Sequence, residues 1–252
     1  MRIDMQKNFE SNNHFTGNPR RSFFYVWIAA FLAILSYIPA IPKLIPAHVH
    51  VPYSTNTLIL LQITVFLISA TIFSAAGAFL APQIGFRAYL ADASIAENTF
   101  WRVLKRQFLY GASTGLVGAI VAYFMAPDFI SYLSMVPLLT RLVGGVFEEV
   151  IMRWGLLTII IWTLWRIFQR GIGIPKELLI YVCIFLSQIL FAFAHAPALV
   201  NYGITHPAWS IFTIFIVSLP WGWLFWKYGL ESAYIAHASF HGFVALFVAV
   251  KL

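Results

Sequence analysis

Residues 57–80 read TLILLQITVFLISATIFSAAGAFL, a run of 24 residues without a charged side chain. A helix that crosses a bilayer needs roughly 20 mostly apolar residues, so this run predicts a transmembrane helix. Other stretches that meet the same requirement are 23–42, 107–126, 136–168, 178–199, 208–227 and 231–250. The sequence therefore predicts an all-α fold, a polytopic transmembrane helix bundle with about seven spans.

The composition of the whole chain agrees with this class. Of 252 residues, 61% are hydrophobic and only 10% are charged, against roughly 25% charged residues in a soluble domain. A soluble protein of this size could not bury so much apolar surface, which excludes a cytosolic globular enzyme. Cys183 is the single cysteine, so an intramolecular disulfide is excluded. We attribute the net charge of +7 to basic cytoplasmic loops and expect no nucleic acid partner.

The basic residues predict the orientation of the bundle. With the N-terminus in the cytoplasm, twelve of the 16 Lys and Arg residues fall in inner segments. Three fall outside (Lys43, Arg141 and Lys251), and Arg153 lies inside a span. This asymmetry is the positive-inside pattern, so we expect a cytoplasmic N-terminus. We expect an integral protein of a bacterial inner membrane.

The domain organisation that we expect is simple. Residues 1–22 predict a flexible cytoplasmic tail, and residues 23–252 predict a single transmembrane helical domain. Residues 82–106 contain several charged side chains and predict an amphipathic linker along the membrane surface.

Ionisable residues inside spans are costly in lipid and therefore mark candidate functional positions. In the fourth span, Glu149 and Arg153 are separated by four residues, so they share a helix face and can form an ion pair. Glu148 lies about 100° around the helix from Glu149, away from that cation. An unpaired carboxylate of this kind suits general-base chemistry on a water molecule. The alternative is a buried pair that only fixes helix packing.

Histidines lie in two later spans. In the fifth span, Phe191 and His195 share a face, and Pro197 predicts a helix end or kink near His195. In the seventh span, His237 and His241 are four residues apart on one face. Each histidine alone is compatible with a hydrogen-bonded residue of the bundle interior.

Taken together, these groups predict a shared polar site within residues 140–245, between the fourth, fifth and seventh spans. On straight helices their heights would differ by roughly two to three turns, so either the fifth and seventh spans are shifted or tilted or their boundaries differ from those given above. Carboxylates and histidines can also bind zinc, and the ligands would then be Glu148, His195, His237 and His241. The sequence lacks an H-E-x-x-H motif. We therefore expect no cofactor.

Three short motifs follow one another on successive apolar helices. They are Glu-Glu-x-x-x-Arg at 148–153, Phe-x-x-x-His at 191–195 and His-x-x-x-His at 237–241. In this order they resemble the CPBP family, the CAAX-protease and bacteriocin-processing family of intramembrane glutamate endopeptidases. The resemblance covers about residues 140–245.

The resemblance implies a role for each motif residue. Glu148 would be the general base, His195 would hold and activate the attacking water, and Glu149 paired with Arg153 would orient the site. His237 and His241 would stabilise the oxyanion. Family members commonly have Asn where this chain has His241, so that role would depend on tautomer or pH here.

We therefore expect an intramembrane endopeptidase that hydrolyses a peptide bond of a membrane-associated protein or precursor peptide. Its partners would be the lipid bilayer and the peptide substrate. One alternative is a non-enzymatic membrane immunity or scaffolding protein that keeps the polar cluster for folding or binding. Another is an ion-coupled transporter, against which the lack of paired broken helices in matching halves counts.

Overall fold

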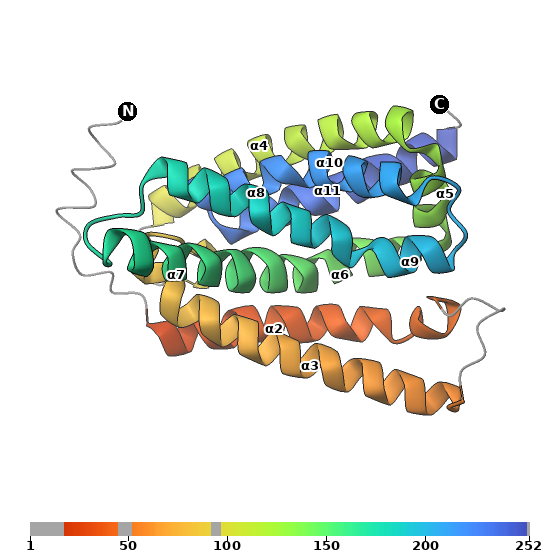
Figure 1. Cartoon of the computed structure of the whole chain (residues 1–252), viewed down its shortest axis with the longest axis horizontal. Helices are drawn as coiled ribbons and strands as arrows, with labels where there is room; N and C mark the ends of the chain where they lie inside the picture. Colours follow the sequence, from red (N-terminus) through yellow and green to blue (C-terminus); the bar gives the residue numbers. More distant parts are fainter. Residues whose placement is uncertain (1–17, 45–51, 92–96, 251–252) are drawn as a thin grey trace.

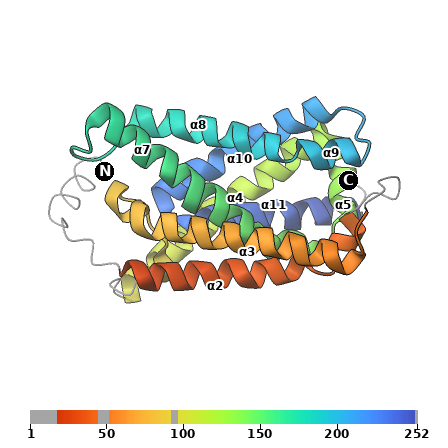
Figure 2. The ribbon, with the colours of Figure 1, turned by 60° about the horizontal axis from the view of Figure 1, so that its bottom comes forward.

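A computed structural model describes residues 18–44, 52–91 and 97–250 of the chain. In these ranges every regular element is a helix, and the long helices run side by side along the length of the molecule (Figure 1). A view turned by 60° shows α2 and α3 as neighbours on one side of the bundle (Figure 2). The predicted all-α fold is therefore confirmed.

The long helices account for the predicted spans. They are α2 (Pro19–Tyr37), α3 (Thr55–Leu80), α4 (Glu97–Met125), α8 (Glu177–Ala194), α10 (Pro207–Tyr228) and α11 (Leu230–Val250). Another is continuous from α6 (Leu138–Glu149) through the π-helix η4 (Val150–Leu157) into α7 (Thr158–Gln169). In the described part of the chain, six helices are long and apolar enough to cross a membrane. The α2 helix is not one of these six, but it packs beside α3 and α6. With α2 included, the bundle has the predicted number of about seven long helices.

Short helices connect these elements. They are η1 (Ile41–Leu44), η2 (Ala81–Ile84), η3 (Tyr89–Ala91), α5 (Pro127–Met135) and α9 (Ala196–Asn201). The α5 helix was not predicted, because nine residues between Pro127 and Pro137 are too few for a span. The α8 helix ends at Ala194 and α9 begins at Ala196, so the predicted break near His195 is confirmed.

Two predicted boundaries were wrong. The α4 helix begins at Glu97 rather than at residue 107. Its charged first turns therefore extend the span instead of forming a separate surface linker, and residues 92–96 of that linker lie outside the described residues. The α2 helix begins at Pro19, because the Asn18 side chain accepts hydrogen bonds from the backbone N–H groups of Arg20 and Arg21. Residues 1–17 of the expected tail lie outside the described residues.

The outer surface of the bundle is apolar. In the most apolar part of α3, mean hydropathy is 2.2 and only 11% of the residues are buried inside the protein. Leu60, Phe124 and Leu178 have exposed fractions of 65%, 79% and 75%. A soluble protein rarely exposes so much contiguous apolar surface, whereas the lipid of a bilayer covers it without cost.

The charges collect at one end of the bundle. The starts of α2, α4 and α8 lie at the same end as the last turns of α3, α7 and α10 (Figure 1). These segments and their connections carry Arg20, Arg21, Arg87, Arg102, Lys105, Arg106, Arg166, Arg170, Lys176 and Lys227. The arrangement is the one that the positive-inside pattern requires, and the side of the membrane to which it belongs stays a prediction.

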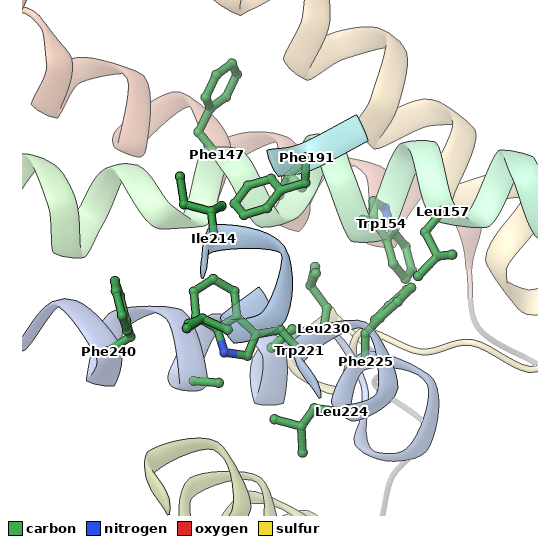
Figure 3. Close-up of a cluster of buried hydrophobic side chains, with 14 of the residues drawn as sticks. Phe147, Trp154, Leu157, Phe191, Ile214, Trp221, Leu224, Phe225, Leu230 and Phe240 are labelled. Carbon is green, nitrogen blue, oxygen red and sulfur yellow. The ribbon is translucent and has the colours of Figure 1, made fainter. Parts of the chain in front are cut away.

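The core between the helices is built from large apolar side chains and close backbone approaches. Figure 3 shows Phe191, Trp221 and Phe225 among the side chains gathered there. The α3 helix approaches η4 closely at Gly77, where a Cβ atom would lie 2.3 Å from the ring of Trp154. A glycine at this position therefore lets Trp154 pack directly against the α3 backbone.

Candidate functional site

A cavity of about 130 Å³ lies between the helices. Four of the predicted site residues line it, Glu148, His195, His237 and His241. The rest of the wall is Tyr37, Phe129, Tyr132, Leu133, Val136, Thr140, Arg141, Phe191, Ile214, Val217, Trp221 and Phe240. The fourth, fifth and seventh spans thus contribute to one cavity, and α2, α5 and α10 complete it.

The remaining two predicted residues lie behind this wall. Arg153 Nη1 lies 3.0 Å from Glu149 Oε1, and the two side chains are 0% and 1% exposed. The second guanidinium nitrogen, Nη2, donates to Gln188 Oε1 at 2.9 Å. The ring of Phe191 lies 4.5 Å from the guanidinium carbon. These contacts pair the two buried charges and hold the carboxylate of Glu149 beside the cavity, while Glu149 Oε2 and Arg153 Nε have no hydrogen-bond partner among the described residues.

Glu149 also binds His237. His237 Nδ1 lies 2.8 Å from Glu149 Oε1, and this nitrogen is the donor because a carboxylate only accepts. The His237 ring stacks on Trp221 with a centroid distance of 4.6 Å. The hydrogen bond and the stacking fix the ring, so that its second nitrogen, Nε2, faces His241 and Glu148.

The second nitrogen of His237 links the two histidines. His237 Nε2 and His241 Nε2 are 3.1 Å apart, so one of them donates to the other. In a neutral His237 that donates from Nδ1, Nε2 must accept, and His241 then donates from Nε2. When His237 is protonated, its Nε2 donates to His241 Nε2. A neutral His241 then carries its own proton on Nδ1. That Nδ1 atom is buried and has no hydrogen-bond partner among the described residues.

Glu148 differs from Glu149 in its surroundings. Its side chain is 32% exposed, and Oε2 lies 3.9 Å from His237 Nε2. The other oxygen, Oε1, accepts a hydrogen bond of 2.9 Å from the Tyr37 hydroxyl. No arginine or lysine of the described residues forms an ion pair with Glu148. This carboxylate therefore faces the cavity without a permanent cation, as the spacing of the Glu pair predicts.

His195 occupies the break between α8 and α9. Its Nδ1 atom lies 2.9 Å from the carbonyl oxygen of Phe191, which can only accept. A neutral His195 therefore keeps Nε2 as an acceptor, a form that can take a hydrogen bond from a water molecule in the cavity. Pro197 in the first turn of α9 lacks a backbone N–H, which accounts for the helix ending at this point.

The heights of these residues agree because the helices are staggered. The α7 and α8 helices extend farther than α11 toward the end of the bundle where α2 begins (Figure 1). His237 Nε2 lies 3.9 Å from Glu148 Oε2, so this part of α11 is at the level of Glu148. The mismatch of two to three turns that straight helices predict is therefore absent from the structure.

The residues proposed as metal ligands do not form a preformed set. In the part of the chain that the structure describes, no three His, Cys, Asp or Glu side chains are grouped so that they could hold an ion. His237 instead uses both ring nitrogens in hydrogen bonds to Glu149 and His241.

Sequence reasoning missed four residues of this site, Tyr37, Gln188, Arg141 and Tyr132. Gln188 is an amide in the middle of a span, and that signal could have identified it. Tyr37 and Tyr132 gave no such signal, because tyrosine is common in membrane helices near the interface. The positive-inside pattern gives Arg141 only an outer position, whereas the structure places it within α6 and in the wall of the cavity. Burial, then Tyr202 and Glu148, raise the pKa of Tyr132 to about 12, so its hydroxyl keeps its proton.

Comparison with known proteins gives one result. Residues 130–243 match the family described as type II CAAX prenyl endopeptidase Rce1-like. This range includes the three motifs and is consistent with the family that the motifs resemble. Comparison with curated proteins and with solved structures gave no match.

Proposed function

We propose that this chain, whose residues 130–243 form an Rce1-like domain of the type II CAAX prenyl endopeptidase family, hydrolyses peptide bonds with a water molecule activated by Glu148. The observation that carries the proposal is the contrast between the two neighbouring carboxylates. Glu149 is enclosed and paired with Arg153, whereas Glu148 faces the cavity beside three histidines. Only Glu148 is free to exchange a proton with a bound water.

In the proposed reaction, Glu148 and the three histidines act in successive steps. Glu148 removes a proton from water while His195 Nε2 accepts a second hydrogen bond from it, and the hydroxide attacks the peptide carbonyl carbon. The histidine pair, His237 and His241, stabilises the oxyanion when the pair carries an additional proton, because His241 Nδ1 is then a donor. Glu148 then gives its proton to the leaving amine as the carbon–nitrogen bond breaks. General-base catalysis of this kind contributes roughly 10²- to 10⁴-fold.

The walls of the cavity support a peptide with apolar side chains as the proposed substrate. Apolar side chains from α5, α10 and α11 face the polar groups of α6 and α8. The apolar side chains of an extended peptide can contact the apolar wall while its backbone faces the polar groups. A membrane-associated protein or precursor peptide can reach a cavity within the bilayer. The proposed substrate is such a peptide, in a bacterial inner membrane.

The test is cleavage of membrane-inserted peptides by the full chain in liposomes. We expect Glu148→Gln to lower kcat by roughly 10²-fold or more, because the amide cannot accept the proton. Glu177→Gln is the matched control, since Glu177 lies at the start of α8 and its side chain is 55% exposed. The proposed chemistry uses no metal, so EDTA should leave cleavage unchanged.

Unchanged cleavage in the Glu148→Gln variant would refute the proposal. Ion flux across the liposome membrane without proteolysis would support a transporter instead. A phenotype that survives Glu148→Gln in cells would support the immunity or scaffolding alternative.

A further inference from the structure

Arg141 is a charged residue in the wall of the cavity, and the proposed reaction gives it no role. It belongs to the first half of α6 and lines the same cavity as Glu148 and His241. Its Nε and Nη1 atoms are buried and have no hydrogen-bond partner among the described residues. No carboxylate of those residues lies within ion-pair distance of it.

Arg141 lacks the kind of partners that surround the other buried arginine, Arg153. Arg153 is enclosed by a carboxylate, an amide oxygen and two aromatic rings. A guanidinium stays charged at every relevant pH and presents five N–H groups in a planar fork. An uncompensated cation within a membrane span is costly, and such residues commonly mark a binding function. Arg141 is therefore placed and charged to receive an anion from outside the chain.

The position of Arg141 relative to Glu148 defines where that anion would lie. The two residues are seven positions apart, which is about two turns, so they project from one face of α6. The axial separation is about 10 Å at 1.5 Å per residue. A substrate anchored at Arg141 can extend along this face toward the water that Glu148 activates, with a few residues between anchor and scissile bond.

The chemistry of the guanidinium selects the ligand. Arginine pairs with carboxylates through two parallel N–H···O bonds, and a peptide carries such a group at its C-terminus or on an acidic side chain. The cavity wall also contains Leu133 and Val136 from α5 and the following link, which suit an apolar side chain next to the carboxylate. We infer that Arg141 forms a carboxylate-binding subsite that anchors the peptide substrate on one side of the scissile bond. This inference rests on the proposed function only for the nature of the substrate.

A binding experiment tests the subsite without requiring cleavage. The probes are N-acetyl-leucine, which has a free carboxylate, and N-acetyl-leucinamide, which does not. Binding to the purified full chain in detergent micelles is measured by saturation-transfer NMR. We expect the acid to bind more tightly than the amide by roughly tenfold, as a charged hydrogen-bonded pair implies. Arg141→Gln should remove this preference, and Arg141→Lys should keep part of it.

A cleavage experiment extends the test to substrates. Three peptides share one sequence and differ in carrying a free C-terminus, an amidated C-terminus, or an amidated C-terminus preceded by Glu. The ratio of kcat/KM between a carboxylate peptide and the neutral one does not depend on the folded fraction of a variant. We expect a ratio above roughly ten in the wild type and a ratio near one in Arg141→Gln. The peptide that shows the preference identifies a terminal or a side-chain carboxylate.

Two results would overturn the subsite. One is equal binding of the acid and the amide by the wild-type chain. The other is an Arg141→Gln variant that lowers kcat/KM equally for all three peptides. Both leave the role of Glu148 untouched, whereas loss of the proposed function appears as cleavage that survives Glu148→Gln.

Discussion

The hydroxyl of Tyr37 donates a hydrogen bond of 2.9 Å to Glu148 Oε1, although 111 residues separate them in the chain. Tyr37 is the last residue of α2 and lies outside the matched range 130–243. The bond leaves Glu148 Oε2 directed toward His237. One oxygen of the proposed base is thus positioned by a helix that contributes no motif.

Tyr37→Phe should lower kcat with little change in KM, because it removes a bond that orients the base and leaves the apolar walls intact. A hydrogen bond to a charged group contributes about 1.5–3 kcal/mol, which corresponds to roughly a 10- to 100-fold lower rate. Steady-state kinetics in liposomes measure both constants. Tyr25→Phe on the same helix is the control, since Tyr25 is 51% exposed. A change confined to KM would contradict the positioning role.

Gly144→Ala should reproduce the effect of Tyr37→Phe. A Cβ atom at Gly144 would lie 2.7 Å from the ring and the hydroxyl of Tyr37, so the ring must move away from α6 and its bond to Glu148 is lost. Gly242→Ala in α11 adds the same methyl group with nothing within 4 Å, and it should leave the rate near that of the wild type. If Gly144→Ala combined with Tyr37→Phe is slower than either alone by the product of both effects, the two residues act separately and the explanation fails.

Arg153→Met should lower the free energy of unfolding of the chain. Removing one partner of a buried ion pair leaves the other charge unpaired and costs about 3–5 kcal/mol. Thermal unfolding in detergent should show a clearly lower Tm for this variant. Arg102→Met removes an exposed arginine of α4 and should leave Tm nearly unchanged. Equal Tm values for both variants would mean that the pair adds nothing to stability.

Single cysteines should reveal the orientation. The native Cys183 is fully buried, so it should not react with a membrane-impermeant maleimide. Thr205→Cys lies in the exposed connection between α9 and α10, and Ile172→Cys lies in the connection between α7 and α8, where Ile172 is 74% exposed. With a cytoplasmic N-terminus, intact cells should label position 205 and not position 172. The opposite result would reverse the predicted topology.

The helical class, most spans and the residues of the three motifs could be predicted from the sequence because each leaves a local signal. Long apolar runs reveal spans, and a charge inside such a run reveals a polar interior. The α4 start and α5 could not be predicted in this way. Charged turns extend α4 beyond the apolar run, and α5 is too short to show a membrane signal.

The contacts that complete the site depend on how helices pack, which no local pattern contains. The bond between Tyr37 and Glu148 joins α2 to α6, and Gln188 reaches Arg153 from α8. From the sequence, Arg141 is one of the three basic residues on the outer side, and nothing in its local pattern links it to the site. Only the packing of α6 against α2 and α11 places its side chain in the cavity wall.

The π-helix η4 begins at Val150, immediately after the glutamate pair, and ends at Leu157. Within it the hydrogen bonds span five residues rather than four, and the Thr158 hydroxyl also reaches back five residues to the Arg153 carbonyl. The widened turns change the rotational phase of the helix between its two halves. A residue inserted or deleted in this segment could therefore be absorbed locally. The π-helix therefore sets how the half that follows it is rotated relative to the half that bears Glu148.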